Sequence, residues 1–377
     1  MRLLLLAYSL DPGGAERQFV NLAKALAEKG VDVHIATFYG GGRLEREVAS
    51  FDGIRLVSLG KSGRRDFARF GWRMRRYVGQ HHFDIVYSFL SGPNVVALLA
   101  RTLRTRPRII WGVRASPLDY SHYEQTVRWV ERAERLLSPL TDRIVVNSRA
   151  GLKDWLKSGY PEAKLTHIPN GIDTQRFIPD PNAYDSVRQE IGVPVSTPLI
   201  GLVGRSDPRK DHKTFLEGAA ALRRRIPETH FLCIGRTAAH REPYAQELRH
   251  YESQFGLTPF VHWLGDRTDV PRLMASLNVL TSSSAFGEGF PNVVAEGMAC
   301  GAPCVVTDVG DSAYIVGDTG TILPPRDPEA LADGWAKILA LPRDRRREMG
   351  KRARARVEQF FSVDRMAEET LRVLQAV

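Results

Sequence analysis

The sequence has little cysteine, no long hydrophobic run and no Asp-x-Asp motif, and each absence narrows the possible functions. Its cysteines, Cys233, Cys300 and Cys304, are too few and odd in number for a disulfide framework, and no Cys or His cluster has zinc-ligand spacing. The apolar run from Leu3 to Leu10 is eight residues long, far below the roughly 20 of a membrane-spanning helix. We therefore expect reduced cysteines in a cytoplasmic protein that does not cross a membrane.

Size and composition indicate a globular protein with two domains. The 377 residues are 43% hydrophobic and 25% charged, which excludes disordered, collagen-like and coiled-coil chains. The net charge of +10 lies in the first half: residues 1–180 hold 28 Lys and Arg against 18 Asp and Glu, whereas residues 181–377 hold 25 of each kind. This division favours one domain that meets an anionic surface over a uniformly basic, nucleic-acid-binding protein.

Short apolar segments alternate with amphipathic helical patterns, which is typical of α/β domains with doubly wound parallel sheets. The expected strands are 2–8, 32–37, 54–59, 85–89, 109–113 and 143–147 in the first half and 199–203, 230–234, 261–264, 279–282, 304–307 and 321–323 in the second. We place a linker at 170–182, where Pro and Asn-Gly interrupt both the strand period of 2 and the helix period of 3.6. We expect domains at 1–175 and 176–360, with a carboxy-terminal helix at 361–377 packing back on the first.

Ligands of such sheets bind at the carboxyl ends of the strands, so the loops after the strands are candidate sites. Gly13 and Gly14 follow the first strand and open a helical pattern, where backbone N–H groups and the helix dipole suit an anion. Taken alone, this glycine pair is better explained by a plain tight turn. The dinucleotide fingerprint G-x-G-x-x-G is absent.

The strand expected at 199–203 leads into a basic loop. Gly204, Arg205, Arg209 and Lys210 follow it and precede a helical pattern. The forked guanidinium of Arg and the ammonium of Lys can neutralise a diphosphate. Because these residues follow a strand, we favour a binding site over a solvated charge cluster. The spacing of a Walker loop is absent.

The segment SSSAFGEGFPNVVAEGMACGAPCVVTDVG carries two glutamates, Glu288 and Glu296. Pro291 suits the first turn of a helix, which places Glu288 in the loop before the helix and Glu296 inside it. A carboxylate is a double acceptor that suits vicinal hydroxyls such as a ribose diol. The backbone amides between the two glutamates lie at the positive end of the helix and suit anionic or hydroxyl-rich ligands.

Together these motifs resemble those of the retaining glycosyltransferases of family 4, which have the GT-B fold of two facing Rossmann-like domains with a cleft between them. The resemblance covers nearly the whole chain, through GGAER, PNGID, GR with PRKDHKTF, and EGFPNVVAEGMACGAPCV. It implies transfer of a hexose or N-acetylhexosamine from a nucleotide diphosphate sugar, by default UDP-linked and otherwise GDP-linked. The implied acceptor is a glycan or a lipid-linked sugar in cell-surface polysaccharide or lipopolysaccharide biosynthesis.

The resemblance also implies roles for single residues. Arg205 and Lys210 look like the pair that holds the donor diphosphate, and Glu288 looks like the carboxylate beside the transferred sugar. Glu296 looks like the ligand of the ribose hydroxyls. The resemblance implies that Gly13 and Gly14 close the cleft from the other domain and that Gly265 and Arg267 lie near the nucleotide base. It also implies that Gly289, Phe290, Asn292 and Val293 contact the sugar and phosphate through their amides.

The implied mechanism needs no metal and no other cofactor. No Asp-x-Asp motif occurs, and Arg205, Lys210 and a helix N-terminus would stabilise the leaving diphosphate. The family is thought to deliver the acceptor to the face that the donor leaves, so no protein nucleophile is expected. One position departs from the family pattern: many relatives have a His where this sequence has Arg114, and His122 is the other acceptor-side candidate.

The stretch from Lys61 to Arg76 contains seven basic residues against one acid, with Phe67, Phe70, Met74 and Tyr77 on one helical face. This pattern is typical of an amphipathic helix on an anionic membrane. An ordinary packed helix with a solvated arginine face explains it nearly as well. The lipid-linked acceptors of many relatives favour the membrane, so we expect an enzyme that is peripheral on the inner face of the cytoplasmic membrane.

Two other hypotheses remain open. A sugar-nucleotide epimerase could share the GT-B fold, but it would need acid and base groups flanking the sugar and no acceptor site. A nucleic-acid-binding protein could use the basic first half, yet the sequence has no helix-turn-helix, zinc-finger or ribonucleoprotein signature.

Overall fold

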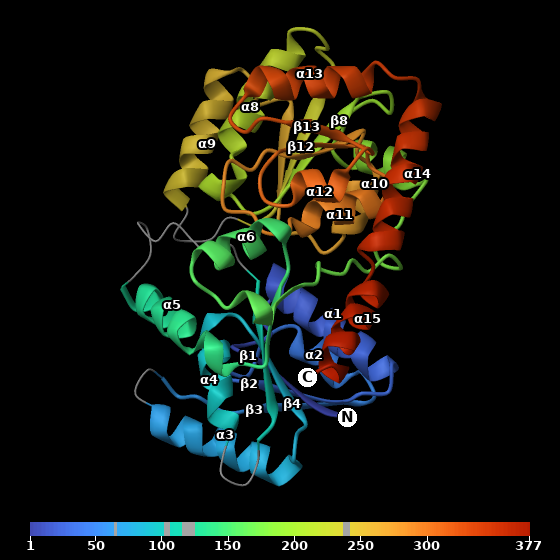
Figure 1. The fold of residues 1–377 in the computed structure, drawn as a ribbon. Coiled ribbons are helices and arrows are strands. Elements are labelled where there is room, and N and C mark those ends of the chain that lie inside the picture. Colours follow the sequence, from blue (N-terminus) through green and yellow to red (C-terminus); the bar gives the residue numbers. More distant parts are fainter. Residues whose placement is uncertain (64–65, 102–105, 115–124, 237–241) are drawn as a thin grey trace. The chain divides into compact units, whose positions relative to one another are not determined.

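The chain folds into two compact units (Figure 1). The computed structural model describes residues 1–63, 66–101, 106–114, 125–236 and 242–377. Unit 1 consists of Met1–Gly171 and Val363–Val377, and unit 2 is the continuous segment Ile172–Ser362. The sequence-based boundary between 175 and 176 therefore lies a few residues beyond the one seen here, because Ile172 and Phe177 are already buried in the core of unit 2.

Unit 1 is built on a seven-stranded parallel sheet with the order β3-β2-β1-β4-β5-β6-β7. Its strands are β1 (Arg2–Ala7), β2 (Asp32–Thr37), β3 (Ile54–Ser58), β4 (Ile85–Phe89), β5 (Arg108–Val113), β6 (Arg143–Val146) and β7 (Leu165–His167). The sequence did not predict β7, because its three residues are only half-buried and show no apolar run. The helices of this unit are α1 (Gly14–Glu28), α2 (Glu45–Ala49), α3 (Phe67–His81), α4 (Ser91–Ala97), α5 (Gln125–Leu137), α6 (Arg149–Lys157) and α15 (Val363–Gln375).

Unit 2 is built on a six-stranded parallel sheet with the order β10-β9-β8-β11-β12-β13. Its strands are β8 (Leu199–Val203), β9 (His230–Ile234), β10 (Val261–Gly265), β11 (Val279–Ser282), β12 (Cys304–Thr307) and β13 (Thr321–Leu323). Its helices are α7 (Ala183–Glu190), α8 (His212–Arg223), α9 (Glu242–Gln254), α10 (Val270–Ala275), α11 (Asn292–Ala299), α12 (Ser312–Val316), α13 (Pro328–Leu339) and α14 (Arg343–Phe360). The prediction of two doubly wound parallel sheets is confirmed.

The strand β1 shows why these sheets form from nearly continuous apolar runs. Successive side chains of a strand point to opposite faces, so a sheet covered by helices on both sides needs apolar residues at every position. Leu3 and Leu5 pack with α1 and α15 in one core cluster, whereas Leu4 and Leu6 pack with α3 in the other. The three cysteines are buried and free within the two core clusters of unit 2.

Helix α3 corrects the expectation of a membrane-facing apolar stripe. Phe70 and Met74 are buried in the core of unit 1, and the Tyr77 hydroxyl lies 2.9 Å from Nδ1 of His34 on β2. This stripe covers the sheet, because an amphipathic helix in a doubly wound domain turns its apolar side to the strands. The side chain of Phe67 lies outside the described residues. None of the helices in the described parts of the chain has the length and apolar character of a membrane span.

The contact between α14 and α11 in unit 2 leaves no room for a side chain at Gly350. A Cβ placed there would lie 2.1 Å from the carbonyl oxygen of Gly301, just beyond the end of α11. The two helices can therefore approach closely only because residue 350 is glycine.

We predict that Gly350→Ala lowers the free energy of unfolding by about 1–3 kcal/mol, because α14 must move away from α11. The measurement is equilibrium denaturation by urea. The matched control is Gly79→Ala on α3, where an added Cβ meets no atom within 4 Å. The control should leave stability unchanged or raise it by up to about 1 kcal/mol; equal effects of the two changes would contradict the packing argument.

Candidate functional site

The loop after β8 is fixed by two aspartates that act as caps. The carboxylate of Asp207 accepts hydrogen bonds from the backbone N–H and Nε of Arg209, both at 3.0 Å. Asp211 adopts a left-handed conformation with φ of 49° and caps α8, accepting a hydrogen bond from the N–H of Thr214 at 3.2 Å. Lys210 stands between these caps, so its backbone position is set from both sides.

Lys210 forms an ion pair with Glu288, which lies in the loop after β11. The Lys210 Nζ lies 2.6 Å from Oε1 of Glu288, and the hydroxyl of Ser284 donates to the same oxygen at 2.9 Å. The Lys210 side chain is 24% exposed and that of Glu288 is 13% exposed. The loops are also joined through their backbones, because the hydroxyl of Ser283 donates to the Lys210 carbonyl at 2.8 Å. Two residues that are 78 positions apart in the sequence thus form one partly buried charge pair.

Opposing effects set the protonation of Glu288. Burial raises its pKa, but the charge and hydrogen bond of Lys210, the Ser284 hydroxyl and the charge of Arg209 together hold the pKa below its ordinary value. Glu288 is therefore an ionised carboxylate at neutral pH, and Lys210 makes the largest contribution to this state.

The segment from Glu288 to Pro291 is held against the loop after β12. The Gly289 carbonyl accepts a hydrogen bond from the N–H of Asp311 at 2.9 Å. Gly310 has φ of +61°, and a Cβ there would lie 2.5 Å from the Glu288 carbonyl oxygen, so only glycine allows this approach. Because a trans peptide directs its C=O and N–H to opposite sides, the N–H of Phe290 points away from Asp311.

Helix α11 begins directly after this segment. Pro291 is the N-cap and not a residue of the first turn, a one-residue shift from the sequence prediction. The Phe290 side chain is buried against Phe361, with ring centroids 5.6 Å apart, and Val293 packs against the same core. These two residues can therefore offer a ligand their backbone amides and not their side chains. Glu296 lies half-buried within α11.

The other basic residue of the predicted diphosphate pair, Arg205, is exposed at the carboxyl end of β8. Its side chain makes no hydrogen bond or ion pair with the residues that the structure describes. Arg205 and Lys210 thus leave the same loop, but Lys210 is paired and Arg205 is not.

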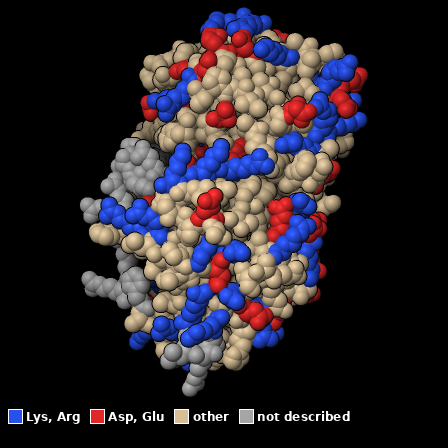
Figure 2. Space-filling model, in the orientation of Figure 1, with Lys and Arg blue, Asp and Glu red and all other residues tan. Residues whose placement is uncertain are grey.

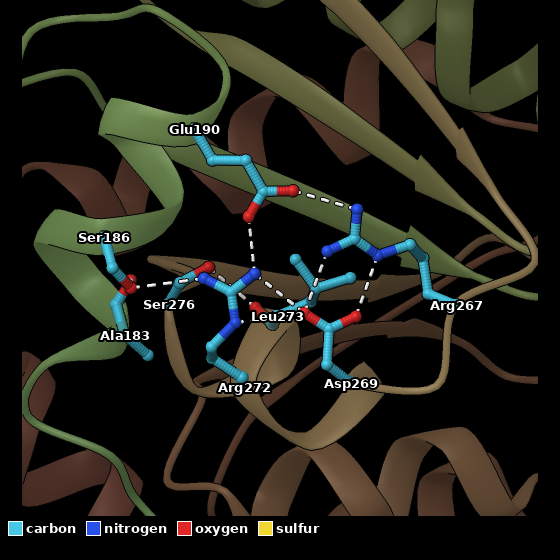
Figure 3. Close-up of polar contacts among 8 residues, drawn as sticks. All are labelled: Ala183, Ser186, Glu190, Arg267, Asp269, Arg272, Leu273 and Ser276. Atoms are coloured by element: carbon cyan, nitrogen blue, oxygen red, sulfur yellow. Dashed lines mark hydrogen bonds and ion pairs between the residues drawn. The ribbon is translucent and has the colours of Figure 1, made fainter.

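Arg267, predicted to lie near the nucleotide base, is part of a charge network (Figure 3). Its guanidinium binds the Asp269 carboxylate at 2.8 and 2.9 Å and the Glu190 carboxylate at 2.8 Å. Arg272 joins the same two carboxylates. Hydrogen bonds from Arg267 hold the pKa of Asp269 well below its ordinary value. The network ties α7 to the loop before α10, so Arg267 has a structural role. Gly265, two residues earlier in the sequence, is the last residue of β10 and has φ of +65°.

The candidates from the first half of the sequence lie in unit 1. Gly13 is the N-cap of α1 and Gly14 its first residue, as the glycine-rich turn predicted. Arg114 follows β5 and is buried, donating to Asn170 and to the Tyr87 hydroxyl, each at 3.0 Å. Its guanidinium also lies 4.3 Å from the ring centroid of Phe89. Arg114 therefore anchors the PNGID segment to the sheet, and His122 lies outside the described residues.

Sequence reasoning missed the hydroxyls that support the charge pair. Ser284 contacts Glu288 directly, and Ser283 holds the Lys210 backbone. The run of serines before Phe286 was the available signal, because short hydroxyl side chains at a strand end serve as donors to nearby carboxylates and carbonyls. In the described parts of the chain, no group of three or more His, Cys, Asp or Glu residues could hold a metal ion.

Comparison with known proteins gives matches in both units. The model of Glycosyltransferase Family 4 matches residues 12–176, and the model named Glycosyl transferases group 1 matches residues 197–340. A GDP-mannose-dependent alpha-(1-6)-phosphatidylinositol monomannoside mannosyltransferase of Mycolicibacterium smegmatis is 27% identical over 282 residues, covering 72% of this chain and 71% of the relative. A D-inositol 3-phosphate glycosyltransferase of Corynebacterium urealyticum is 28% identical over 360 residues, covering 88% of this chain and 83% of the relative.

A solved structure has the same fold over the whole chain. The crystal structure of HepE from Anabaena in complex with UDP superimposes with a TM-score of 0.85 at 22% identity and covers 100% of both chains. At this identity the likeness shows the shared fold.

We predict that Lys210→Met lowers the free energy of unfolding by roughly 2–3 kcal/mol at about pH 7, because it leaves a buried carboxylate without its cation. The deficit should shrink as the pH falls. In the wild type the lowered pKa of Glu288 gives stability that is present above its ordinary pKa of 4.5 and is lost as the pH falls through the lowered pKa.

The measurement is urea denaturation of both proteins at about pH 7 and about pH 3.5. The control is Lys213→Met, which breaks the exposed pair of Lys213 with Glu247 and should cost less than about 1 kcal/mol. A Lys210→Met deficit that is the same at both pH values would show that Glu288 does not depend on Lys210.

Proposed function

The chain belongs to glycosyltransferase family 4, and on that basis we propose that it transfers a hexose or N-acetylhexosamine, with retention, from a nucleotide diphosphate sugar to a glycan or lipid-linked acceptor. The observation that carries this proposal is the Lys210–Glu288 pair beside the N-terminus of α11. It brings a cation, a carboxylate and helix-end amides to the carboxyl edge of one parallel sheet, where ligands of such sheets bind.

The donor diphosphate would bind between Arg205 and Lys210. Arg205 has an exposed guanidinium, and Lys210 has an ammonium group that a phosphate oxygen can take from Glu288. Both groups are positive where negative charge develops as the bond to the anomeric carbon breaks, and α11 adds the positive end of its dipole. Binding of the diphosphate at Lys210 would therefore free the Glu288 carboxylate to face the sugar hydroxyls.

The other groups would orient the donor. The Glu296 carboxylate accepts hydrogen bonds from the ribose hydroxyls, and the amides of Gly289 to Val293 contact the sugar and phosphate. Gly265 would lie near the base, and we include Gly13 and Gly14, at the start of α1 in unit 1, among the donor-side residues. The acceptor hydroxyl attacks from the face that the diphosphate leaves, so the protein supplies no nucleophile. The reaction proceeds without a metal, since Arg205 and Lys210 carry the compensating charge.

UDP is the nucleotide that we favour, with GDP as the alternative. The Anabaena protein with the same fold was solved with UDP and with UDP-glucose, whereas the mycolicibacterial relative is named for GDP-mannose. An acceptor in cell-surface polysaccharide or lipopolysaccharide biosynthesis fits relatives that are named for phosphatidylinositol mannoside and for a diphosphoundecaprenol-linked sugar.

We predict that one nucleotide, UDP in preference to GDP and ADP, raises the thermal unfolding midpoint of the protein by several degrees, with or without a chelator. A ligand at about 100 times its dissociation constant adds roughly 2.7 kcal/mol to stability. Glu296→Ala should weaken this nucleotide's binding about tenfold or more, because a carboxylate that accepts from two hydroxyls is lost.

The control for this experiment is Glu329→Gln, which removes an exposed carboxylate on α13 and should not alter binding. A midpoint that no nucleotide raises, or equal binding by Glu296→Ala and the wild type, would contradict the assigned donor site. If a chelator abolished the nucleotide-induced increase of the unfolding midpoint, metal independence would be contradicted. Incubation with the donor sugar alone separates an epimerase, which converts the donor without an acceptor.

We also propose that the protein works in the cytoplasm at the inner face of the membrane, through the solvent side of α3. Its core-facing stripe is buried, but Trp72 on the opposite side is 59% exposed, with the Arg76 guanidinium 5.3 Å from its ring centroid. Arg69 is exposed one turn earlier. Trp and Arg in this arrangement suit the boundary between lipid headgroups and acyl chains. Arg73 takes no part, because it is paired with Asp66.

We predict that changing Arg69 and Arg76 to Gln weakens binding to phosphatidylglycerol vesicles about tenfold or more, since each basic residue near an anionic surface contributes about 1 kcal/mol. Vesicle sedimentation measures the change, and the control is Arg224→Gln with Arg345→Gln, an equal loss of charge from exposed positions in unit 2. Trp72→Ala should also weaken binding. Equal losses in the α3 variant and the control would show that this face is not the contact.

A further inference from the structure

A cavity of about 390 Å³ lies in unit 2 at the edge of the sheet opposite to the candidate donor site. Leu277, Asn278 and Pro303 line it, and these residues directly precede β11 and β12. The loops that carry Lys210 and Glu288 follow the carboxyl ends of β8 and β11. The cavity is therefore distinct from the site of the proposed transfer, and its volume lies in the range of small-molecule sites.

One wall of the cavity is a row of cations on α14. Arg343, Arg347, Lys351 and Arg354 all line it, and their spacing of four, four and three residues places them on one face of the helix. Arg354 is engaged with the carbonyls of Phe177 and Ala299 and forms an ion pair with Glu358 at 2.7 Å. Arg347 and Lys351 are exposed and make no hydrogen bond or ion pair with the described residues. The face drawn in Figure 2 shows Lys and Arg atoms along the course of α14, with Asp and Glu atoms among them.

The stability of α14 does not explain this row. Like charges four residues apart destabilise a helix, and cations near a helix N-terminus oppose its dipole. Arg343 and Arg347 stand in the first turns of α14. Arg343, Arg347 and Lys351 thus weaken the helix that carries them, and a bound anion would relieve both effects.

A buried cation lies behind the opposite wall. Arg188 is fully buried, and its hydrogen bonds go to neutral oxygens: the carbonyls of Tyr184, Thr197 and Ser276 and the side chain of Asn278. Its guanidinium lies 3.5 Å from the ring centroid of Tyr184, which itself lines the cavity. Burial lowers the pKa of Arg188 to about 10, which leaves it cationic at neutral pH. The cavity therefore has positive charge on both sides.

The remaining wall is mostly apolar. Pro179, Tyr184 and Leu277 line it, and the single lining carboxylate, Asp180, accepts a hydrogen bond from the N–H of Asn182 at 2.9 Å in a turn. A ligand that satisfies these walls needs an anionic group and a compact organic part. An Arg and a Lys one helical turn apart suit the tetrahedral phosphate group.

We propose that this cavity binds a phosphate-bearing molecule, with the phosphate held by Arg347 and Lys351 and the organic part lying against Pro179, Tyr184 and Leu277. The inference does not rest on the glycosyltransferase activity. The ligand's phosphate comes either from a free organic phosphate or from a phospholipid headgroup, and the experiment separates the two.

Isothermal titration calorimetry of the full-length protein with phenyl phosphate and with inorganic phosphate tests the site. The wild type should bind phenyl phosphate more tightly, because only that probe reaches the apolar wall. Arg347→Glu should weaken phenyl phosphate binding about tenfold or more, since a charge-assisted hydrogen bond is replaced by repulsion. The matched control is Arg345→Glu, an exposed position on α14 that does not line the cavity and should retain the wild-type affinity.

A second variant fills the apolar part while keeping the cations. Ala275→Trp, at a lining position on α10, should abolish phenyl phosphate binding and leave inorganic phosphate binding unchanged. The proposal is overturned if Arg345→Glu and Arg347→Glu weaken binding equally, or if saturating UDP displaces phenyl phosphate, because the probe would then occupy the donor site. The UDP competition also keeps this result separate from failure of the proposed transfer.

Vesicle binding tests whether the phosphate belongs to a phospholipid headgroup. Binding to phosphatidylglycerol vesicles but not to phosphatidylcholine vesicles, lost in Arg347→Glu and retained in Arg345→Glu, assigns the phosphate to a lipid headgroup. Phenyl phosphate binding with no such vesicle dependence assigns it to a free organic phosphate. If neither probe depends on Arg347, the cavity does not bind phosphate.

Discussion

The ion pair between Lys210 and Glu288 is the contact on which the architecture of the candidate site depends. It joins the loop after β8 to the loop after β11, which are neighbouring strands in the sheet of unit 2. The Asp207 and Asp211 caps, the Ser283 and Ser284 hydroxyls and the close approach at Gly310 all fix the backbone on either side of this pair. A partly buried charge pair of this kind gives little net stability but is costly to break. It therefore fixes the loop geometry while leaving a cation that can exchange one anionic partner for another.

The strands other than β7 were predictable because each is a short apolar run bounded by turn residues, whereas β7 has no apolar run. The contacts between the site loops were not predictable, since they join residues far apart in the chain, as the pairing of Lys210 with Glu288 across 78 positions illustrates. The motifs identified the loops, but only the fold shows that Arg267 is occupied by Asp269 and Glu190 and that Arg114 is buried against Phe89. Helix α3 shows the same limit: its amphipathic pattern predicts an apolar face correctly but does not say whether lipid or protein covers that face.

Helix α11 runs between the candidate site and the cavity beside α14. Its first turn follows the segment that holds Glu288, and the residues just after its end, Cys300 and Gly301, line the cavity beside α14. The Ala299 carbonyl at its end accepts a hydrogen bond from Arg354 at 2.6 Å, so the negative end of its dipole is neutralised by a cation from α14. Both ends of this helix are thus placed where charge is concentrated, and α14 positions it from one side through the close contact at Gly350.

The chain leaves and re-enters unit 1 at adjacent points. Ile172 donates to the Phe361 carbonyl at 2.7 Å and forms an isolated bridge with Ser362, while a Cβ on Gly171 would lie 2.7 Å from Cα of Val363. Unit 2 is therefore a single uninterrupted stretch whose two ends meet, the arrangement that permits a domain to be excised, permuted or exchanged as a cassette. Unit 1 is not separable by one cut, because it is assembled from both ends of the chain. Unit 2 could accordingly be replaced in one piece, with α15 remaining to complete unit 1.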